Sequence, residues 1–209
     1  MTNQSVTKKR ERNPEVRPAQ IMDAALALFS EKGFAATRMD EVAAKAGLSK
    51  GALYLYFPDK VALLKTLVQE TAGSVIGAAA LMMAAHEGPV SPLLPLILGF
   101  VAEKLETSNI AAVIKLVLSE GRAHPEIGKA YLENVIGRAF PLMEGLIARG
   151  VAGGEFRAVD AGMVVRSFIA PMLLAAFWKS TFEPLGAAPL SVRALAAHHA
   201  DLIVRALKP

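Results

Sequence analysis

The sequence predicts an all-α protein of nine helices, with a three-helix helix-turn-helix headpiece at the N-terminus and a larger C-terminal helical bundle. Three observations support this fold class. Apolar residues recur three and four positions apart along almost the whole chain after residue 16, as on one face of a helix. Glycines, prolines and N-capping residues interrupt this pattern between successive apolar segments. No run of alternating valines or aromatic residues suggests a strand.

A polar segment precedes the first expected helix. Residues 1–16 carry no apolar period, and we expect them to form a flexible basic arm. The first helix then has an apolar stripe at helical spacing, formed by Ile21, Ala24, Ala25, Leu28 and Phe29. Gly33 ends this helix as a C-terminal cap.

Two short helices follow, joined by residues 46–49. Thr37 is interpreted as the N-cap of the second helix, because Asp40 three residues later gives an Asp version of the capping box. Ser49 is interpreted as the N-cap of the third helix, and Pro58 stops that helix because proline disfavours a helical conformation at the residue before it. This pair predicts a helix-turn-helix, whose second helix enters the major groove of DNA.

The remaining helices are longer, and we expect them to form a bundle from residue 64 to 209, after a DNA-binding domain of residues 17–63. Their expected ranges are 59–85, 91–107, 109–121, 124–150, 160–182 and 191–207. The longest uncharged apolar runs are shorter than the roughly 20 residues that span a bilayer. We therefore expect buried helices and no membrane partner.

Composition and charge narrow the function classes. The chain has 209 residues, of which 53% are hydrophobic and 20% charged, as in a folded globular protein. There is no cysteine, which excludes disulfides, thiolate catalysis and cysteine-ligated zinc. Residues 1–60 carry ten Lys and Arg against seven Asp and Glu, so +3 of the net charge of +4 lies there, as a phosphate-facing surface needs. The N-terminus does not resemble a secretory signal, and we expect a cytoplasmic location.

The third helix has an outer face that is unusual for a helix in water. Leu53 and Phe57 share the inward face. The other side then carries Lys50, Gly51, Tyr54 and Leu55, with Tyr56 beside them. Tyrosines reach phosphates with their hydroxyls or pack on thymine methyl groups, and lysine supplies a charge for a phosphate. Thr37, with the free N–H groups of its helix, and Lys60 are expected to bind phosphate as well.

Segment 17–63 resembles the DNA-binding domain of the tetracycline-repressor (TetR) family over its whole length. The strings AALALFSEKGF, MDEVAAKAGLSKG and LYLYF stand in the family's order and spacing. The resemblance covers about a quarter of the chain at the level of motifs. The later helices are similar to the family only in number, length and order.

The resemblance implies particular contacts at matching positions. Those with a phosphate or a base are Thr37, Lys50, Tyr54, Tyr56 and Lys60, and Gly51 would allow close approach to the DNA backbone. Ala52 departs from the family's usual hydroxyl residue, so one polar contact is expected to be missing. Arg38 and Leu55 occupy variable positions and are expected to set the operator sequence, Leu55 through a thymine methyl group. The alternatives are that the two tyrosines are core residues and that the lysines are simply solvated.

The resemblance also implies a homodimer through the last two helices and a cavity for a small-molecule inducer. The sequence offers as interface candidates Phe168, Ala175, Ala176, Leu195, His199 and Leu202. Pro141 and Pro171 interrupt helices that could bend around a cavity, for which the candidates are Phe100, Leu116, Met143, Met172 and Trp178. Both sets could equally be ordinary intramolecular core. The hypothesis is that the inducer displaces the fourth helix and thereby releases double-stranded operator DNA.

Two other function classes remain open. An enzyme or metal protein is conceivable from Glu120 and His124, four residues apart, and from His198 with His199. With four histidines in all and no further ligand spacing, we expect no cofactor, no metal and no catalysis. A helical scaffold or membrane-associated protein is favoured by the mean hydropathy alone. The sequence does not distinguish a repressor, the family's common mode, from an activator.

Overall fold

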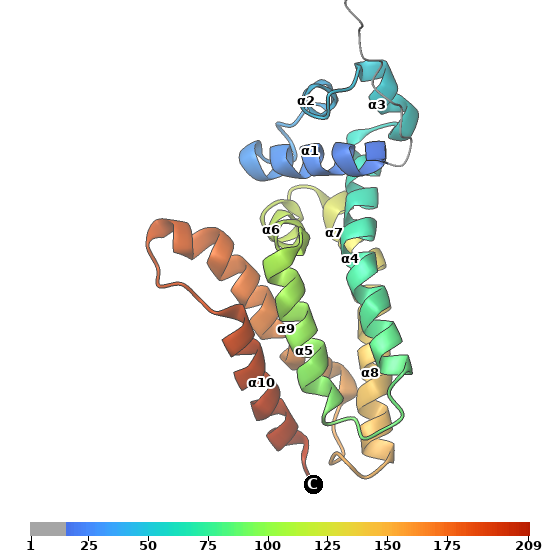
Figure 1. Ribbon diagram of the computed structural model, residues 1–209, viewed down its shortest axis with the longest axis vertical. Coiled ribbons are helices and arrows are strands. Elements are labelled where there is room, and N and C mark those ends of the chain that lie inside the picture. The colour runs from blue at the N-terminus through green and yellow to red at the C-terminus, as the bar shows by residue number, and fades with distance from the viewer. Residues whose placement is uncertain (1–15) are drawn as a thin grey trace, which may run out of the picture.

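The computed structural model describes residues 16–209, all of whose regular elements are helical. The predicted arm, residues 1–16, therefore lies outside the described residues except for its last position. Figure 1 shows a headpiece lying across one end of an elongated bundle. The headpiece contains α1 (Val16–Lys32), α2 (Met39–Lys45) and α3 (Lys50–Tyr56), and α4 (Lys60–Ala84) leads from it into the bundle.

The bundle continues with five further helical segments in the described chain. They are α5 (Leu93–Thr107), α6 (Ile110–Glu120), α7 (Pro125–Tyr131) continuing through a π-turn (Leu132–Ile136) into α8 (Gly137–Ala152), α9 (Ala161–Phe177) with a second π-turn (Trp178–Phe182), and α10 (Val192–Leu207). With α7 and α8 counted as one continuous helix, the prediction of an all-α chain of nine helices is confirmed. The π-turns were not predicted, because the apolar period runs through them without interruption.

Side-chain caps define the starts of α3, α9 and α10. Ser49 Oγ accepts a hydrogen bond from Ala52 N, and Asp160 and Ser191 cap α9 and α10 in the same way. The expectation for Thr37 was wrong: the N-cap residue of α2 is Arg38. Its backbone N–H donates to the carboxylate of Glu41 at 2.8 Å, so that a side chain of the first turn satisfies the N-cap N–H.

Thr37 is displaced from the cap by the turn that precedes it. Gly33 has a φ of +85°, a conformation that suits glycine and turns the chain sharply after α1. The Thr37 hydroxyl donates to the Gly33 carbonyl at 2.8 Å and is buried within the same turn. Thr37 therefore closes the α1–α2 turn and does not cap a helix.

Two hydrophobic cores hold the chain together. One lies in the bundle, among α5, α6, α8, α9 and α10, with Val75 of α4. The other lies in the headpiece, where it also includes Val113 and Leu116 of α6 and Ile127 of α7. The headpiece core therefore extends beyond the domain boundary predicted near residue 63, because the corner between α6 and α7 is part of it.

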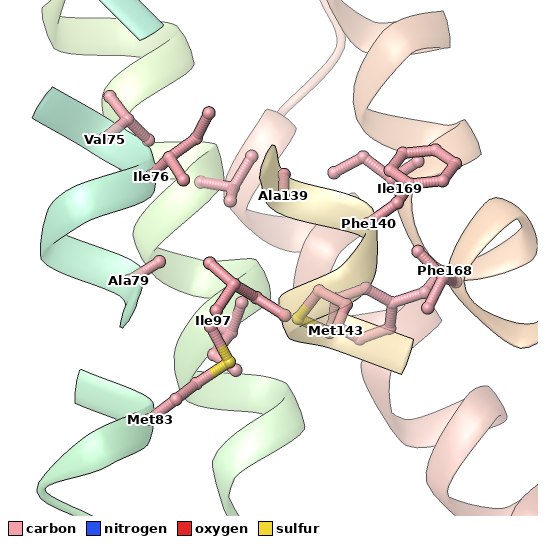
Figure 2. A pocket seen from close by; sticks show the side chains of 13 residues that line it. Val75, Ile76, Ala79, Met83, Ile97, Ala139, Phe140, Met143, Phe168 and Ile169 are labelled. Atoms are coloured by element: carbon pink, nitrogen blue, oxygen red, sulfur yellow. The ribbon is translucent and has the colours of Figure 1, made fainter. Parts of the chain in front are cut away.

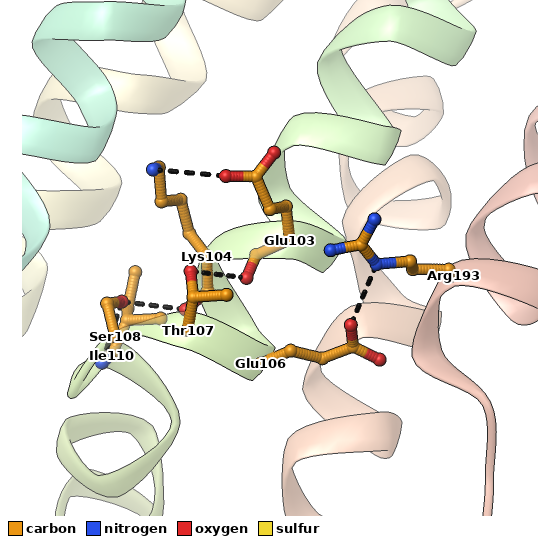
Figure 3. A network of polar contacts seen from close by, with 7 residues as sticks. All are labelled: Glu103, Lys104, Glu106, Thr107, Ser108, Ile110 and Arg193. Carbon is orange, nitrogen blue, oxygen red and sulfur yellow. Dashed lines mark hydrogen bonds and ion pairs between the residues drawn. The ribbon is translucent and has the colours of Figure 1, made fainter.

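Helix α10 is fixed along α5 by packing and by polar contacts at their ends. Figure 3 shows Arg193 of α10 pointing at Glu106 of α5, with 2.8 Å between Nε and Oε2. The Thr107 and Ser108 hydroxyls donate back to the carbonyls of Glu103 and Lys104 and so satisfy the last turn of α5. Of these contacts, the Arg193–Glu106 ion pair joins the two helices.

Two helical stretches of the described chain, Lys60–Ala84 and Ala161–Leu185, are long and apolar enough to cross a membrane by length and composition. The lengths of the uncharged apolar runs had predicted that no helix would be long enough to cross a membrane. Core helices of proteins without membrane segments pass the same test, so this finding alone assigns no membrane. In the most apolar 18-residue stretch of each, 22% of the residues are buried in Lys60–Ala84 and 28% in Ala161–Leu185. Each helical stretch therefore keeps an outward apolar face.

Candidate DNA-binding surface and effector cavity

Helix α3 is held to the headpiece by one apolar face. Leu53 is fully buried and Phe57 almost so. The turn that leads into α3 contains Gly47 at a φ of +68°, and the N–H of Leu48 donates to the Ala43 carbonyl at 2.8 Å. A left-handed glycine here lets α2 end and α3 begin within a few residues. The inward pair that the sequence predicted is confirmed.

The opposite face of α3 lies open to solvent. Leu55 is 86% exposed, and Tyr54 and Tyr56 are 41% and 36% exposed. Lys50 and Gly51 are exposed as well, whereas Ala52 is half-buried. Arg38 is exposed at the start of α2. These side chains form one surface, here called the α3 surface: Arg38, Lys50, Gly51, Tyr54, Leu55 and Tyr56.

An ion pair joins the two helices of this surface. Lys50 Nζ lies 3.0 Å from Asp40 Oδ1, with both side chains largely exposed. The hydrogen bond from Lys50 holds the pKa of Asp40 below its ordinary value, and the same contact raises the pKa of Lys50. Lys50 therefore carries its charge at neutral pH and stands where a phosphate can approach it.

The other two predicted contacts are engaged inside the headpiece. The Thr37 side chain is buried in the α1–α2 turn, as described above. Lys60 Nζ donates to the carbonyls of Phe34, Ala35 and Thr37 at 2.6, 3.0 and 3.0 Å. The side chain of Lys60 is thus folded back onto the α1–α2 turn, and its contact with a phosphate stays a prediction.

The α6–α7 corner contacts the headpiece beside Lys60. The His124 ring meets the Phe34 ring edge-on at a centroid distance of 5.2 Å. Its Nε2 and Nδ1 lie 3.7 and 3.5 Å from Glu120 and Glu126. Within the described residues no group of three or more His, Cys, Asp or Glu side chains could hold a metal ion. The pairing of Glu120 with His124 that suggested a metal is thus part of a contact between bundle and headpiece.

A cavity of about 90 Å³ lies in the bundle, and every residue that lines it is apolar. Figure 2 shows side chains from α4, α5, α8 and α9 converging on it. The lining from α4 consists of Val75, Ile76, Ala79 and Met83. One wall of the cavity therefore belongs to the helix that leads directly to the headpiece.

Only one of the five predicted cavity residues, Met143, lines this cavity. Leu116 belongs to the headpiece core, and Met172 is fully packed in the bundle core. Phe100 packs beside the core under the ammonium of Lys104. Trp178 donates from Nε1 to the Ala188 carbonyl at 3.0 Å, in the second π-turn. The period of each helix identifies its apolar positions, but their direction toward a cavity depends on how four helices are rotated against one another.

The predicted interface residues also separate into two groups. Phe168, Ala175 and Ala176 are buried within the chain, so they are intramolecular core. Leu195 is half-buried, and so is His199, whose Nε2 donates to the Ser167 carbonyl. Leu202 is 49% exposed. The sequence reasoning missed an outward apolar row on α9, at helical spacing: Met163, Leu174 and Phe177, which are 65%, 53% and 37% exposed.

Comparisons with known proteins agree with this architecture. Residues 21–67 match the model of "Bacterial regulatory proteins, tetR family", and residues 94–201 match that of "Tetracyclin repressor-like, C-terminal domain", which spans more than half of the chain. The chain is 28% identical over 180 residues to the HTH-type transcriptional regulator RutR of Escherichia coli, covering 84% of this chain and 76% of RutR. It is 51% identical over 45 residues to the uncharacterized HTH-type transcriptional regulator YerO of Bacillus subtilis, where the match covers 22% of this chain and 16% of that protein.

A solved structure extends the likeness to the whole fold. The transcriptional regulator FadR from Bacillus subtilis, in complex with stearoyl-CoA, superposes with a TM-score of 0.74 at 21% sequence identity. The superposition covers 90% of this chain and 98% of that one. At this identity the likeness concerns the fold, namely a headpiece followed by a helical bundle.

Proposed function

The chain belongs to the TetR family of DNA-binding transcriptional regulators, a family without enzymatic activity, and from this premise we propose that it is a cytoplasmic repressor that binds a palindromic operator as a homodimer and is released by a small apolar inducer. One observation carries the proposal for DNA. A short helix anchored by Leu53 presents an outward face of lysine, tyrosine and leucine. Such a face is unfavourable in water and suits the major groove.

Within the α3 surface the side chains divide by chemistry. Lys50 and the tyrosine hydroxyls supply phosphate contacts, which give affinity without sequence information. Arg38 and Leu55 are the proposed readers of base edges, Arg38 through hydrogen bonds to guanine and Leu55 through a thymine methyl group. Half-buried Ala52 offers no hydrogen bond at the position where the family usually has a hydroxyl.

A second copy of the chain is the proposed cover for the outward apolar face of α9 and α10. Two headpieces must lie about one helical turn of DNA apart to read a palindrome. Met163, Leu174 and Phe177 on α9 and Leu202 on α10 supply exposed apolar surface. Leu202→Glu should convert a dimer into a folded monomer in light scattering and should abolish cooperative operator binding. A wild-type chain that is monomeric at micromolar concentration would refute the dimer.

The apolar cavity supports the proposal for the inducer. Its volume of about 90 Å³ is far below the roughly 300–1,000 Å³ of typical ligand pockets, so a ligand of ordinary size must push its walls apart. Since α4 supplies one wall, expansion of the cavity displaces the helix that joins the bundle to the headpiece. We propose that this displacement changes the spacing of the paired α3 helices and lowers operator affinity.

Selection of bound duplexes from random DNA would test the function as a whole. A repressor of this kind should select a palindrome, and screened apolar compounds should release the chain from it. By linkage the operator must weaken inducer binding by the same factor as the inducer weakens operator binding. Equal inducer affinity with and without the operator would refute the induction model.

An activator of the same fold would select the same kind of palindrome, and a reporter gene behind that site would distinguish it.

A further inference from the structure

The cavity in the bundle is apolar on every side, and this limits the kind of molecule that can enter it. None of the side chains that line it carries a strong hydrogen-bonding group. A polar group that moved from water into this cavity would lose its hydrogen bonds, which is costly. The part of a ligand that enters must therefore be apolar, and a polar or charged group of the same ligand must stay at the mouth.

The exposure of the lining residues locates the mouth of the cavity. Among them Leu142 of α8 alone is exposed, to 40%, whereas the others are buried or half-buried. On α4 the neighbouring surface is made by glycines: a Cβ built on half-buried Gly77 would meet nothing within 4 Å. Open space therefore lies beside α4 where a side chain would otherwise close it.

Arg138 of α8 stands at the same edge. Its Nη1 lies 3.6 Å from the position that a Cβ on Gly73 of α4 would take, so the guanidinium rests against α4. Arg138 and Leu142 are four residues apart and project from the same side of α8. Helices α4 and α8 both run away from the headpiece (Figure 1), so Gly77, one turn after Gly73, lies beside Leu142. The mouth thus lies between α4 and α8, with a cation at its rim.

The two arginines beside the cavity differ in their partners. Arg166 of α9 lies over the ring of Phe140, a lining residue, with 5.5 Å between its guanidinium carbon and the ring centroid. It donates to the Gly162 carbonyl at 2.8 Å, and the Glu144 carboxylate lies 4.0 Å from it. Arg138 is exposed and makes no ion pair or side-chain hydrogen bond with the described residues. It is therefore the cation available to a ligand, whereas Glu144 would repel an anion at Arg166.

We propose that the inducer is an amphipathic anion, whose apolar chain fills the cavity while a carboxylate or phosphate group stays at the mouth and is held by Arg138. A guanidinium group suits either anion, because it can donate to two oxygens at once. The proposal deepens the inducer model given above and rests on it. Entry between α4 and α8 pushes directly on α4, the helix whose displacement that model requires.

Alkyl probes of one chain length test the charge of the head group. Octanoate and octyl phosphate are anions, octanol is neutral and octylammonium is a cation. Calorimetric titration of the free chain should show that either anion binds about fivefold more tightly than octanol, as expected for one exposed ion pair. Salt should reduce this preference by screening it. Equal binding of octanol and the anions, or no binding of any probe, would overturn the proposal.

Variants at Arg138 test the assigned residue. Arg138→Met should bind octanol like the wild type and lose the preference for the anions. Arg138→Glu should prefer octylammonium, which loss of packing alone would not produce. Arg166→Met, on the other side of the cavity, is the matched control and should keep the wild-type preference. A preference that survives in Arg138→Met and disappears in Arg166→Met would overturn the assignment.

Release of the operator is a separate measurement. Octanoate should release the wild-type chain from its selected operator at a lower concentration than octanol does, and Arg138→Met should remove this difference. Anions that bind with the expected preference and leave the operator bound would overturn the proposal that such an anion is the inducer. If the wild-type chain selects no DNA, the proposed function itself fails. The binding preferences are measured on the free chain and still decide the ligand class in that case.

Discussion

Leu53 and Leu55 lie two residues apart in α3 and face opposite sides of the helix: Leu53 is fully buried, whereas Leu55 is 86% exposed. Leu53→Ala removes side-chain atoms from the headpiece core and leaves a cavity. It should cost about 2–5 kcal/mol of unfolding free energy, measured by urea denaturation. DNA binding should fall with it, because the recognition helix loses its anchor.

Leu55→Ala is the matched control, with the same chemical change on the outer face. Its effect on stability should stay within about 0.5 kcal/mol. Operator affinity should still fall, by about 1 kcal/mol, through loss of an apolar contact to a base. If Leu55→Ala destabilises the fold as much as Leu53→Ala, the orientation of α3 described here is wrong.

Gly150 near the end of α8 is a position where no side chain fits. A Cβ there would lie 2.5 Å from Cε2 of Phe156, whose ring is buried and cannot move aside. Gly150→Ala should therefore destabilise the chain by about 1–3 kcal/mol through overpacking. Gly145 lies in the same helix with nothing within 4 Å of its would-be Cβ. Gly145→Ala should stabilise by about 0.5–1 kcal/mol, and thermal unfolding of the two variants would show opposite signs.

Glu155 gives the bundle a defined dependence on acid. Its carboxylate accepts hydrogen bonds from the N–H groups of Val90 and Ser91. Partial burial alone would raise the pKa of Glu155, but these bonds and nearby Arg149 outweigh it and hold the pKa below its ordinary value. The stabilisation is therefore complete above the unfolded pKa of about 4.3 and is lost as the pH falls from there through the folded pKa.

Glu155→Gln should remove this dependence. At neutral pH the variant should be less stable by about 1 kcal/mol, because a neutral amide replaces a charged acceptor of two N–H groups. The difference between variant and wild type should shrink as the pH falls below about 4.3. Urea titrations at several pH values measure it. A difference that stays constant down to pH 3 would contradict the assigned role.

The headpiece could be predicted closely from the sequence because local rules determine it. The inward pair of α3 follows from helical period alone, and Ser49 caps that helix through a bond that spans three residues. The predicted N-cap at Thr37 was wrong for a local reason too. A threonine close before Met39 fits the capping rule, but the Thr37 hydroxyl donates instead to the carbonyl of Gly33, which has a left-handed backbone conformation. The hydrogen bonds of Lys60 could not be predicted for a non-local reason, since its partners lie 23 to 26 residues earlier in the chain.

The bundle was less predictable because its helices are apolar on more than one side. On α9 a buried row that includes Phe168 and an outward row that includes Leu174 both follow helical spacing. Periodicity identifies the two rows, but the contacts with α5, α6, α8 and α10 decide which one faces inward. Periodicity likewise cannot tell which apolar residues face the cavity, and of the five residues predicted from the sequence Met143 alone lines it.

Ala79 offers a direct test of the cavity, since it lies on the α4 wall and has a small side chain. Ala79→Leu adds three carbon atoms that can enter empty space. Filling a cavity of about 90 Å³ recovers at most about 2 kcal/mol, so the variant should be at least as stable as the wild type. Xenon, which binds dry apolar cavities, should bind the wild type and not Ala79→Leu.

The functional consequence follows from the position of α4. With the cavity filled, an inducer has no room to enter and cannot push α4 outward. Ala79→Leu should therefore bind the selected operator with wild-type affinity and no longer release it when inducer is added. Ala148→Leu, which makes the same change at an exposed position of α8, should respond like the wild type. Release that persists in Ala79→Leu would mean that the inducer binds elsewhere, and the displacement of α4 would then need another cause.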